Sequence, residues 1–179
     1  MELYIVRHGQ TDYNKRNIIQ GRSDIPLNET GIEQAESLKK ELENVKLDIA
    51  ICSPLIRTKQ TAEIILKDRD VEIIYDDRIV ERGFGLLEGQ DIKKYDAKSY
   101  WDFKLNYETE DKVEKISDLF YRTNEFLEDV KSKYKDKNIL VVSHGATIRA
   151  MIFNLYGFSE KDDLLNFRVP NCSLLKYRI

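Results

Sequence analysis

The feature that most constrains the fold is a set of four short apolar runs separated by much longer amphipathic stretches. The runs are Leu3–Val6, Ile49–Cys52, Val71–Tyr75 and Ile139–Val142. Runs of this length with few polar interruptions are typical of strands that are buried on both faces of a sheet. The last residues of the chain, SLLKYRI, have the pattern of a closing strand.

Helical spacing marks the segments between the runs. After Thr30 the apolar residues repeat at helical intervals, and Glu33 stands where a capping box would place it. A second helix is predicted to begin at Ser53-Pro54, with the Ser53 hydroxyl as its cap. Two more are predicted over about 113–134 and from Gly145 to Gly157. Strands that alternate with helices predict an α/β fold, a three-layer α/β/α sandwich with a mostly parallel central sheet.

No linker rich in Gly, Pro or Ser interrupts this alternation, so residues 1–179 are expected to form a single domain. The stretch 91–111 differs, because it is aromatic and charged and has no deep apolar stripe. We interpret it as an insertion, or cap, over one edge of the sheet. Its aromatic residues could line a substrate pocket or pack the cap onto the sheet, and packing is the favoured alternative for Tyr95, Tyr100, Trp101, Phe103 and Tyr107.

Charge and composition exclude several classes of partner. The 29 basic and 32 acidic residues are interspersed and give a net charge of -3, so neither nucleic acid nor an anionic membrane surface is expected as a partner. No apolar run approaches the roughly 20 residues of a membrane span, and the first residues do not resemble a signal peptide. Cys52 and Cys172 suggest no disulfide framework. We therefore expect a cytoplasmic protein.

The chain has only two histidines, and they stand in matched contexts. His8 in LYIVRHG and His144 in ILVVSHG each follow an apolar run and precede a glycine. Ligands of parallel α/β sheets bind beyond the carboxyl ends of the strands, so the two imidazoles are expected to face one crevice. Arg7 and Arg57 would join them there, and guanidinium groups match the oxygens of a phosphoryl group. A purely structural role is the alternative for either histidine, but the repeated context favours function.

The sequence contains no clear pattern for a metal-binding site or a nucleotide-binding loop. There is no His pair at helical spacing and no Cys pair, and the neighbouring arginines would repel a cation. Glycine-rich nucleotide loops are absent as well, so no metal and no cofactor are expected. Ser53 could act as a nucleophile, but SPLIRT lacks the glycine-flanked elbow of hydrolases, and a capping role explains it better.

The stretch RHGQTDYN resembles the signature of the histidine phosphatase superfamily, the phosphoglycerate-mutase-like proteins. Further blocks resemble the family in the expected order, namely QGRSDIPLNETGIEQA, SPLIRTKQTA, ERGFGLLEG and VVSHGATIR. The resemblance implies that His8 is the nucleophile and forms a phosphohistidine, a choice between the two histidines that the residues alone leave open. It also implies that the other site residues hold the phosphoryl group or orient the nucleophile: Arg7, Asn14, Gln20, Gly21, Arg57, His144 and Gly145.

The resemblance assigns the general acid to Glu81, with Asp76, Asp77 and Glu88 as nearby rivals. In the family that the chain resembles, a phosphatase transfers the phosphoryl group from the histidine to water, whereas a mutase excludes water and returns the group to a substrate. Mutases of this type carry a long insertion between the acid and the second histidine, whereas Glu81 and His144 are only 63 positions apart here.

We therefore expect hydrolysis of a small phosphorylated metabolite, with α-ribazole phosphate, sugar phosphates and nucleotide monophosphates left open. A cofactor-dependent phosphoglycerate mutase is the alternative. A catalytically inactive module that binds a phosphorylated ligand is disfavoured, because no histidine, arginine or acid of the pattern is missing. A homodimer is left open.

Overall fold

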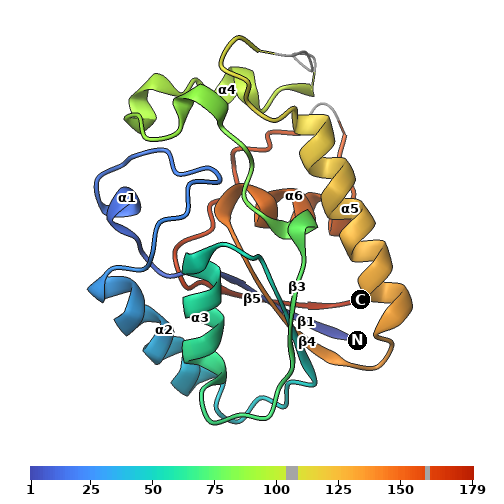
Figure 1. Cartoon of the computed structure of the whole chain (residues 1–179). Helices are drawn as coiled ribbons and strands as arrows, with labels where there is room; N and C mark the ends of the chain where they lie inside the picture. The colour runs from blue at the N-terminus through green and yellow to red at the C-terminus, as the bar shows by residue number, and fades with distance from the viewer. Residues whose placement is uncertain (104–108, 160–161) are drawn as a thin grey trace.

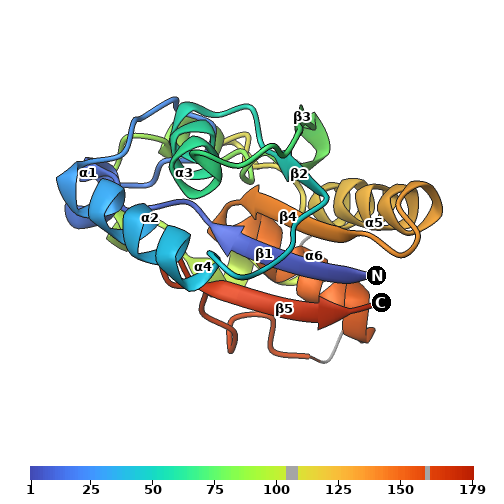
Figure 2. The ribbon, with the colours of Figure 1, turned by 90° about the horizontal axis from the view of Figure 1, so that it is seen from below.

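The computed structural model describes residues 1–103, 109–159 and 162–179, and its centre is a five-stranded sheet with the order β3-β2-β4-β1-β5 (Figures 1 and 2). The strands are β1 Glu2–Arg7, β2 Ile49–Cys52, β3 Ile73–Tyr75, β4 Asn138–Ser143 and β5 Leu174–Arg178. The first four pair in parallel, and β5 runs antiparallel to β1 at one edge. The predicted strands and the mostly parallel sheet are confirmed.

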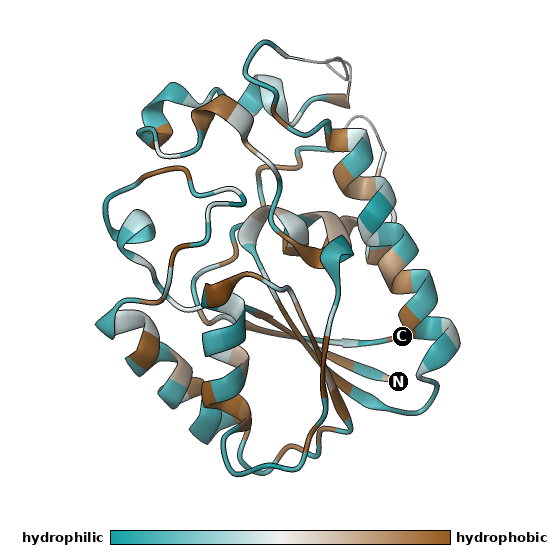
Figure 3. Cartoon of the chain, viewed as in Figure 1, coloured by the Kyte–Doolittle hydropathy of each residue, from teal (hydrophilic) through white to brown (hydrophobic). Residues whose placement is uncertain are grey.

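Helices cover both faces of this sheet. On one face α2 (Glu29–Glu41) and α3 (Ile56–Leu66) pack against side chains such as Tyr4 and Val142. On the other face α5 (Ile116–Lys133) and α6 (Gly145–Tyr156) pack against their neighbours in the strands, such as Leu3 and Val141. Figure 3 shows the apolar residues along the strands and the polar ones on the outer sides of α2 and α5. The predicted three-layer α/β/α architecture is confirmed.

Shorter elements complete the fold. They are α1 Asp12–Lys15, α4 Ala97–Tyr100 and the 3-10 helices η1 Asp77–Ile79, η2 Gly85–Leu87 and η3 Ile92–Lys94. In the described parts of the chain, no helix is long and apolar enough to cross a membrane. Cys52 and Cys172 are both free thiols.

The predicted helix starts need two corrections. Helix α2 begins at Glu29, and the Asn28 side chain, not that of Thr30, accepts the hydrogen bond from Gly31 N at 2.9 Å. The predicted box of Thr30 and Glu33 is therefore wrong. Ile32, which was expected on the buried face, is 44% exposed.

Helix α3 begins at Ile56, later than the predicted Ser53-Pro54, and its N-cap residue makes no side-chain capping bond. Instead, the Asp24 carboxylate accepts from Ile56 N at 2.6 Å, from a loop 32 positions earlier in the chain. The Ser53 side chain is thereby left for another partner. The predicted start and end of α6 at Gly145 and Gly157 are confirmed.

The aromatic segment around η3 and α4 lies beyond the ends of the strands, over the N-terminal parts of α5 and α6 (Figure 1). Trp101 is buried there, and the Phe103 and Phe120 rings lie 5.1 Å apart. Tyr95 stacks on Tyr100 at 5.1 Å. Tyr95, Trp101 and Phe103 therefore pack the segment onto the helices. Tyr100 packs instead against a small cluster formed by Ile19, Leu87 and Val113. Tyr107, named with them above, lies outside the described residues.

Candidate active site

The two histidines are brought together by the pairing of β1 with β4. Arg7 and Ser143 are partners in that parallel register, so the residues that follow them emerge side by side. His8 N donates to Ser143 O at 3.0 Å, and the imidazole centroids of His8 and His144 are 5.2 Å apart. Both side chains are buried, at 1% and 0% exposure. The structure thus places the two imidazoles side by side.

His8 is held in the form that a nucleophile requires. Its Nδ1 lies 2.7 Å from Gly9 O, and because a carbonyl oxygen can only accept, Nδ1 carries the proton. Nε2 then presents its lone pair. Burial, followed by the charges of Arg57 and Arg7, lowers the pKa of His8 well below its ordinary value of 6.5. The imidazole is therefore neutral at physiological pH.

His144 is held from the neighbouring strand end. Its Nε2 lies 2.7 Å from Ser53 Oγ, which follows β2 directly. Its Nδ1 is buried and has no hydrogen-bond partner among the described residues. Burial, then Arg57 and His8, lowers the pKa of His144 well below 6.5. Ser53 is therefore a site residue that the sequence analysis interpreted wrongly as a helix cap.

Two guanidinium groups, those of Arg7 and Arg57, act electrostatically on both imidazoles and are fixed by backbone carbonyl groups. The Arg57 Nη atoms donate to Ser23 O and Gly21 O at 2.8 Å each, and Arg7 Nη1 donates to Val169 O at 2.6 Å. Carbonyl groups orient these cations without neutralising them, and neither forms an ion pair with any described residue. Burial lowers the pKa of Arg57 to about 10, which leaves it protonated at neutral pH.

Three buried nitrogen atoms of this cluster lack a partner within the described parts of the chain: Arg7 Nε, Arg57 Nε and His144 Nδ1. Buried polar groups are nearly always hydrogen-bonded, so orphaned donors mark a place for a ligand. Because two of the three belong to unpaired cations, the ligand that satisfies them is an anion with several acceptor oxygens. Phosphate has that chemistry.

Glu81 lies at the start of α6, beside the same cluster. Its Oε1 accepts from Ala146 N and Thr147 N at 3.2 Å each, and from Thr147 Oγ1 at 3.3 Å. The side chain therefore caps the helix that begins after His144, a contact that no local sequence signal predicts. The Glu81 charge also acts to raise the pKa values of both Arg7 and Arg57, so this carboxyl group interacts electrostatically with the two cations of the site.

The rival acids are engaged elsewhere or lie at the surface. Asp76 pairs with Arg78 at 2.7 Å, and Asp77 is exposed. Glu88 accepts from Arg22 N, Ser23 N and Phe84 N at 3.0, 3.1 and 3.0 Å, and so holds a loop together. Of the four carboxyl groups, Glu81 is the one that contacts the helix beginning directly after His144.

The polar residues after His8 form a connected network. Thr11 Oγ1 lies 3.1 Å from Asn14 Oδ1 and 2.8 Å from Gln20 Oε1. Asn171 Nδ2, which the sequence analysis missed, lies 3.3 Å from Asn14 Oδ1 and donates to His8 O at 2.9 Å. Asn14 and Gln20 are thus tied to the loop that carries His8.

Each glycine near the site occupies its position for a different structural reason. Gly21 has φ +51°, and a Cβ there would lie 2.0 Å from Glu88 Oε1, so only glycine can present its carbonyl to Arg57 in this way. Gly145 begins α6 where a Cβ would stand 3.5 Å from the Arg7 guanidinium. Gly9 packs closely on α2, where a Cβ would lie 2.5 Å from Gly31 O.

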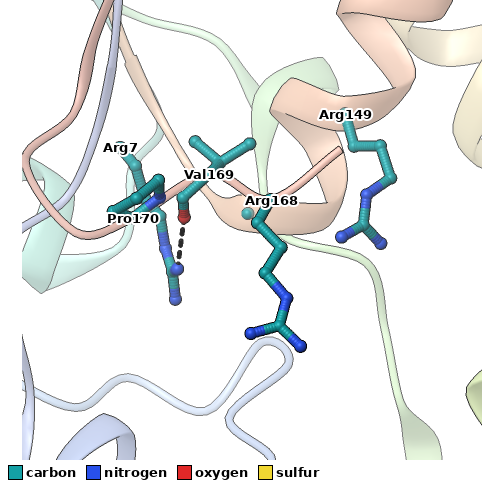
Figure 4. A pocket seen from close by; sticks show the side chains of 6 residues that line it. Arg7, Arg149, Arg168, Val169 and Pro170 are labelled. Carbon is teal, nitrogen blue, oxygen red and sulfur yellow. Dashed lines mark hydrogen bonds between the residues drawn. The ribbon is translucent and has the colours of Figure 1, made fainter. Parts of the chain in front are cut away.

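A cavity of about 330 Å³ opens beside Arg7 and Gly145 (Figure 4). Its other walls are Arg149, Arg168, Val169 and Pro170. Arg149 stands in the block VVSHGATIR, but no sequence pattern predicts that it lines a cavity together with Arg168. Within the described parts of the chain, no three His, Cys, Asp or Glu side chains gather as they would around a metal ion.

Comparison with known proteins places this geometry in a family. The model of the histidine phosphatase superfamily (branch 1) matches residues 3–179. The protein named "Uncharacterized phosphatase PhoE" of Bacillus subtilis is 36% identical over 95% of this chain and 84% of its own length. The protein named "Probable phosphoglycerate mutase GpmB" of Escherichia coli is 31% identical over 97% and 83% of the two chains.

Solved structures agree with this match. The alpha-ribazole phosphatase of Shigella flexneri superposes with a TM-score of 0.87 at 28% identity, over all of this chain and 91% of the other. With the family model covering nearly the whole sequence and the histidine pair at the strand ends, the chain belongs to the histidine phosphatase superfamily, branch 1.

Proposed function

We propose that this protein is a phosphomonoester hydrolase that acts through a phosphohistidine at His8. The observation that carries the proposal is the buried cluster itself: a neutral imidazole with a free Nε2 stands beside orphaned donors on Arg7, Arg57 and His144. This arrangement supplies a nucleophile and a preformed cradle for the charge of a transferring phosphoryl group.

In the first step, His8 Nε2 attacks phosphorus, the N–P bond forms and the bond to the ester oxygen breaks. Arg7, Arg57 and His144 donate to the equatorial oxygens as their charge is redistributed. The leaving alkoxide takes a proton from Glu81.

In the second step, water attacks the phosphohistidine. The Glu81 carboxylate takes a proton from that water, the N–P bond breaks, and its electron pair returns to His8 Nε2. Inorganic phosphate leaves, and Glu81 again carries the proton that the next leaving group needs. Atoms and charges balance over the cycle without a cofactor.

Hydrolysis, and not transfer to a second substrate, is supported by the short interval of 63 positions between Glu81 and His144. That interval leaves little chain with which to exclude water. The phosphatase names of PhoE and of the Shigella structure agree with this choice. The substrate class is a small phosphorylated metabolite.

The proposal is tested by phosphate release from p-nitrophenyl phosphate in the presence and absence of EDTA. We expect hydrolysis that the chelator does not diminish, and activity that disappeared with EDTA would overturn the histidine mechanism. A parallel incubation with 3-phosphoglycerate, with and without its bisphosphorylated primer, tests the alternative function as a phosphoglycerate mutase. Primer-dependent isomerisation without phosphate release would overturn the hydrolase.

A further inference from the structure

The cavity beside the phosphate site is lined by three arginines. Arg7 belongs to both, because its Nε is one of the orphaned donors of the phosphate site and its side chain lines the cavity. Figure 4 shows the guanidinium groups of Arg7, Arg168 and Arg149 extending to the same side of the 168–170 segment. A substrate whose phosphoryl group touches Arg7 therefore has its body next to Arg149 and Arg168.

The arginines of this cavity are positioned by contacts within the fold, and no ion pair with a described residue neutralises them. Arg149 is half-buried, its Nε donates to Phe167 O at 2.9 Å, and its Cζ lies 4.5 Å from the centre of the Trp101 ring. These contacts fix the guanidinium plane and leave its Nη atoms toward the cavity. No described residue forms an ion pair with Arg7, Arg149 or Arg168.

Like charges held this close repel one another, and burial adds to the cost. Burial lowers the pKa of Arg149, and the charges of Arg7 and Arg168 lower it further, while Glu81 acts in the opposite direction. Glu81 also accepts hydrogen bonds from the N-terminus of α6, so its negative charge does not serve to neutralise these arginines alone. An anion in the cavity would relieve the repulsion among the three guanidinium groups.

The side chains of the lining favour an anionic substrate body. None of the six side chains that line the cavity can accept a hydrogen bond: they are Arg7, Gly145, Arg149, Arg168, Val169 and Pro170. A sugar or nucleoside presents hydroxyl donors that need acceptors, whereas a carboxylate only accepts. A planar carboxylate also matches the fork of a guanidinium group.

We propose that this cavity binds a carboxylate carried by the substrate, so that the preferred substrates are small phosphorylated organic acids. The proposal rests on the proposed hydrolase function and adds the class of its substrate. Arg7 joins the two subsites. Arg149 and Arg168 are binding residues for the carboxylate and take no part in the transfer of the phosphoryl group.

The test compares two esters that differ in one group: 3-phosphoglycerate has a carboxylate where glycerol 3-phosphate has a hydroxymethyl group. We expect kcat/KM of the wild type to favour 3-phosphoglycerate by at least about tenfold, since hydrogen bonds to charged groups are worth that much. Arg168→Gln should lower this ratio about tenfold, mainly by raising KM for the carboxylate ester. Arg168 is exposed, so the substitution spares the core.

Arg178→Gln is the matched control. It removes the same charge from an exposed position at the far end of β5, opposite Glu2, and should leave the ratio unchanged. A wild type that hydrolyses both esters equally well, or a ratio that Arg168→Gln does not lower, would overturn the carboxylate site while leaving the hydrolase in place. A preference for propane-1,3-diol bisphosphate over 3-phosphoglycerate would assign the cavity to a second phosphate instead. Hydrolysis of no ester at all would overturn the hydrolase and the inference together.

Discussion

His144 is oriented by one side-chain hydrogen bond from the end of the neighbouring strand. Ser53 follows β2, His144 follows β4, and these strands are adjacent and parallel. The bond from Ser53 Oγ engages Nε2 and so turns the opposite ring nitrogen, Nδ1, toward the phosphate site. Ser53 is thus a positioning residue that acts on phosphate through the imidazole.

Ser53→Ala should lower kcat/KM about tenfold, because losing a buried hydrogen bond of about 1.4 kcal/mol releases the His144 ring. Ser143→Ala is the matched control, since Ser143 is equally buried at a strand end but donates to Ile79 O at 2.8 Å. Both variants should lose similar stability in urea unfolding. Equal loss of activity in the two would show that Ser53 acts only on the fold.

The two buried imidazoles also make stability depend on pH. Their pKa values are lowered in the folded protein, so below pH 6.5 the unfolded chain binds protons that the folded chain does not. The free energy of unfolding should therefore fall as pH falls from 6.5, by about 1.4 kcal/mol per pH unit for each group, and be unaffected by them above about pH 7.

Urea unfolding in phosphate-free buffer between pH 7.5 and 5.0 measures this slope. His144→Gln removes one of the two groups and should roughly halve it. A stability that stayed constant from pH 7 to 5.5 would contradict the lowered pKa values. The shifted carboxyl groups, such as Glu114, have lowered pKa values and lose their contribution only below this window.

At the scale of elements, Glu81 links helix α6 to catalysis. Glu81→Gln keeps an amide oxygen that can accept from Ala146 N and Thr147 N, whereas Glu81→Ala leaves these donors without it. We expect Glu81→Ala to lose about 1 kcal/mol of stability and Glu81→Gln much less. Both variants should hydrolyse alkyl phosphates slowly, because alkoxide leaving groups need a proton, and p-nitrophenyl phosphate less so.

Thermal unfolding and kcat for the two esters separate the capping role from the acid role. If Glu81→Gln turned over alkyl phosphates at the wild-type rate, another carboxyl group would have to be the acid. If Glu81→Ala were as stable as Glu81→Gln, the contact between Glu81 and α6 would contribute nothing to the stability of the fold.

The strands were predictable because each carries its signal in consecutive residues. The same is true of His8 and His144, whose meeting follows from strand ends and parallel pairing. The start of α3 was not, because the partner of its first residue lies in another segment: Asp24 reaches Ile56 N across 32 positions. The start of α2 was assigned to the wrong neighbour, since the side chain of Asn28 and not that of Thr30 accepts from Gly31 N. Ser53 looked like a cap for the same reason, since its true partner stands 91 positions later.

At the scale of the whole molecule, parallel pairing gathers the site at one end of the sheet. Residues from the ends of β1, β2 and β4 meet there, and the segment from η3 to Phe103 lies over α5 and α6 on the same side (Figure 1). The apolar clusters on both faces draw on these same strands. We propose on this ground that residues 1–179 form one domain, and that the sheet fixes the distance between nucleophile and acid.

Trapping the phosphoenzyme shows whether the phosphoryl group passes through His8. Wild-type protein quenched during turnover of a labelled phosphomonoester should carry a phosphoryl group that is labile in acid and stable in base, and mass spectrometry should place it on His8. His8→Ala should carry none. Acid-stable label on Ser53, or label that persisted in His8→Ala, would contradict the account.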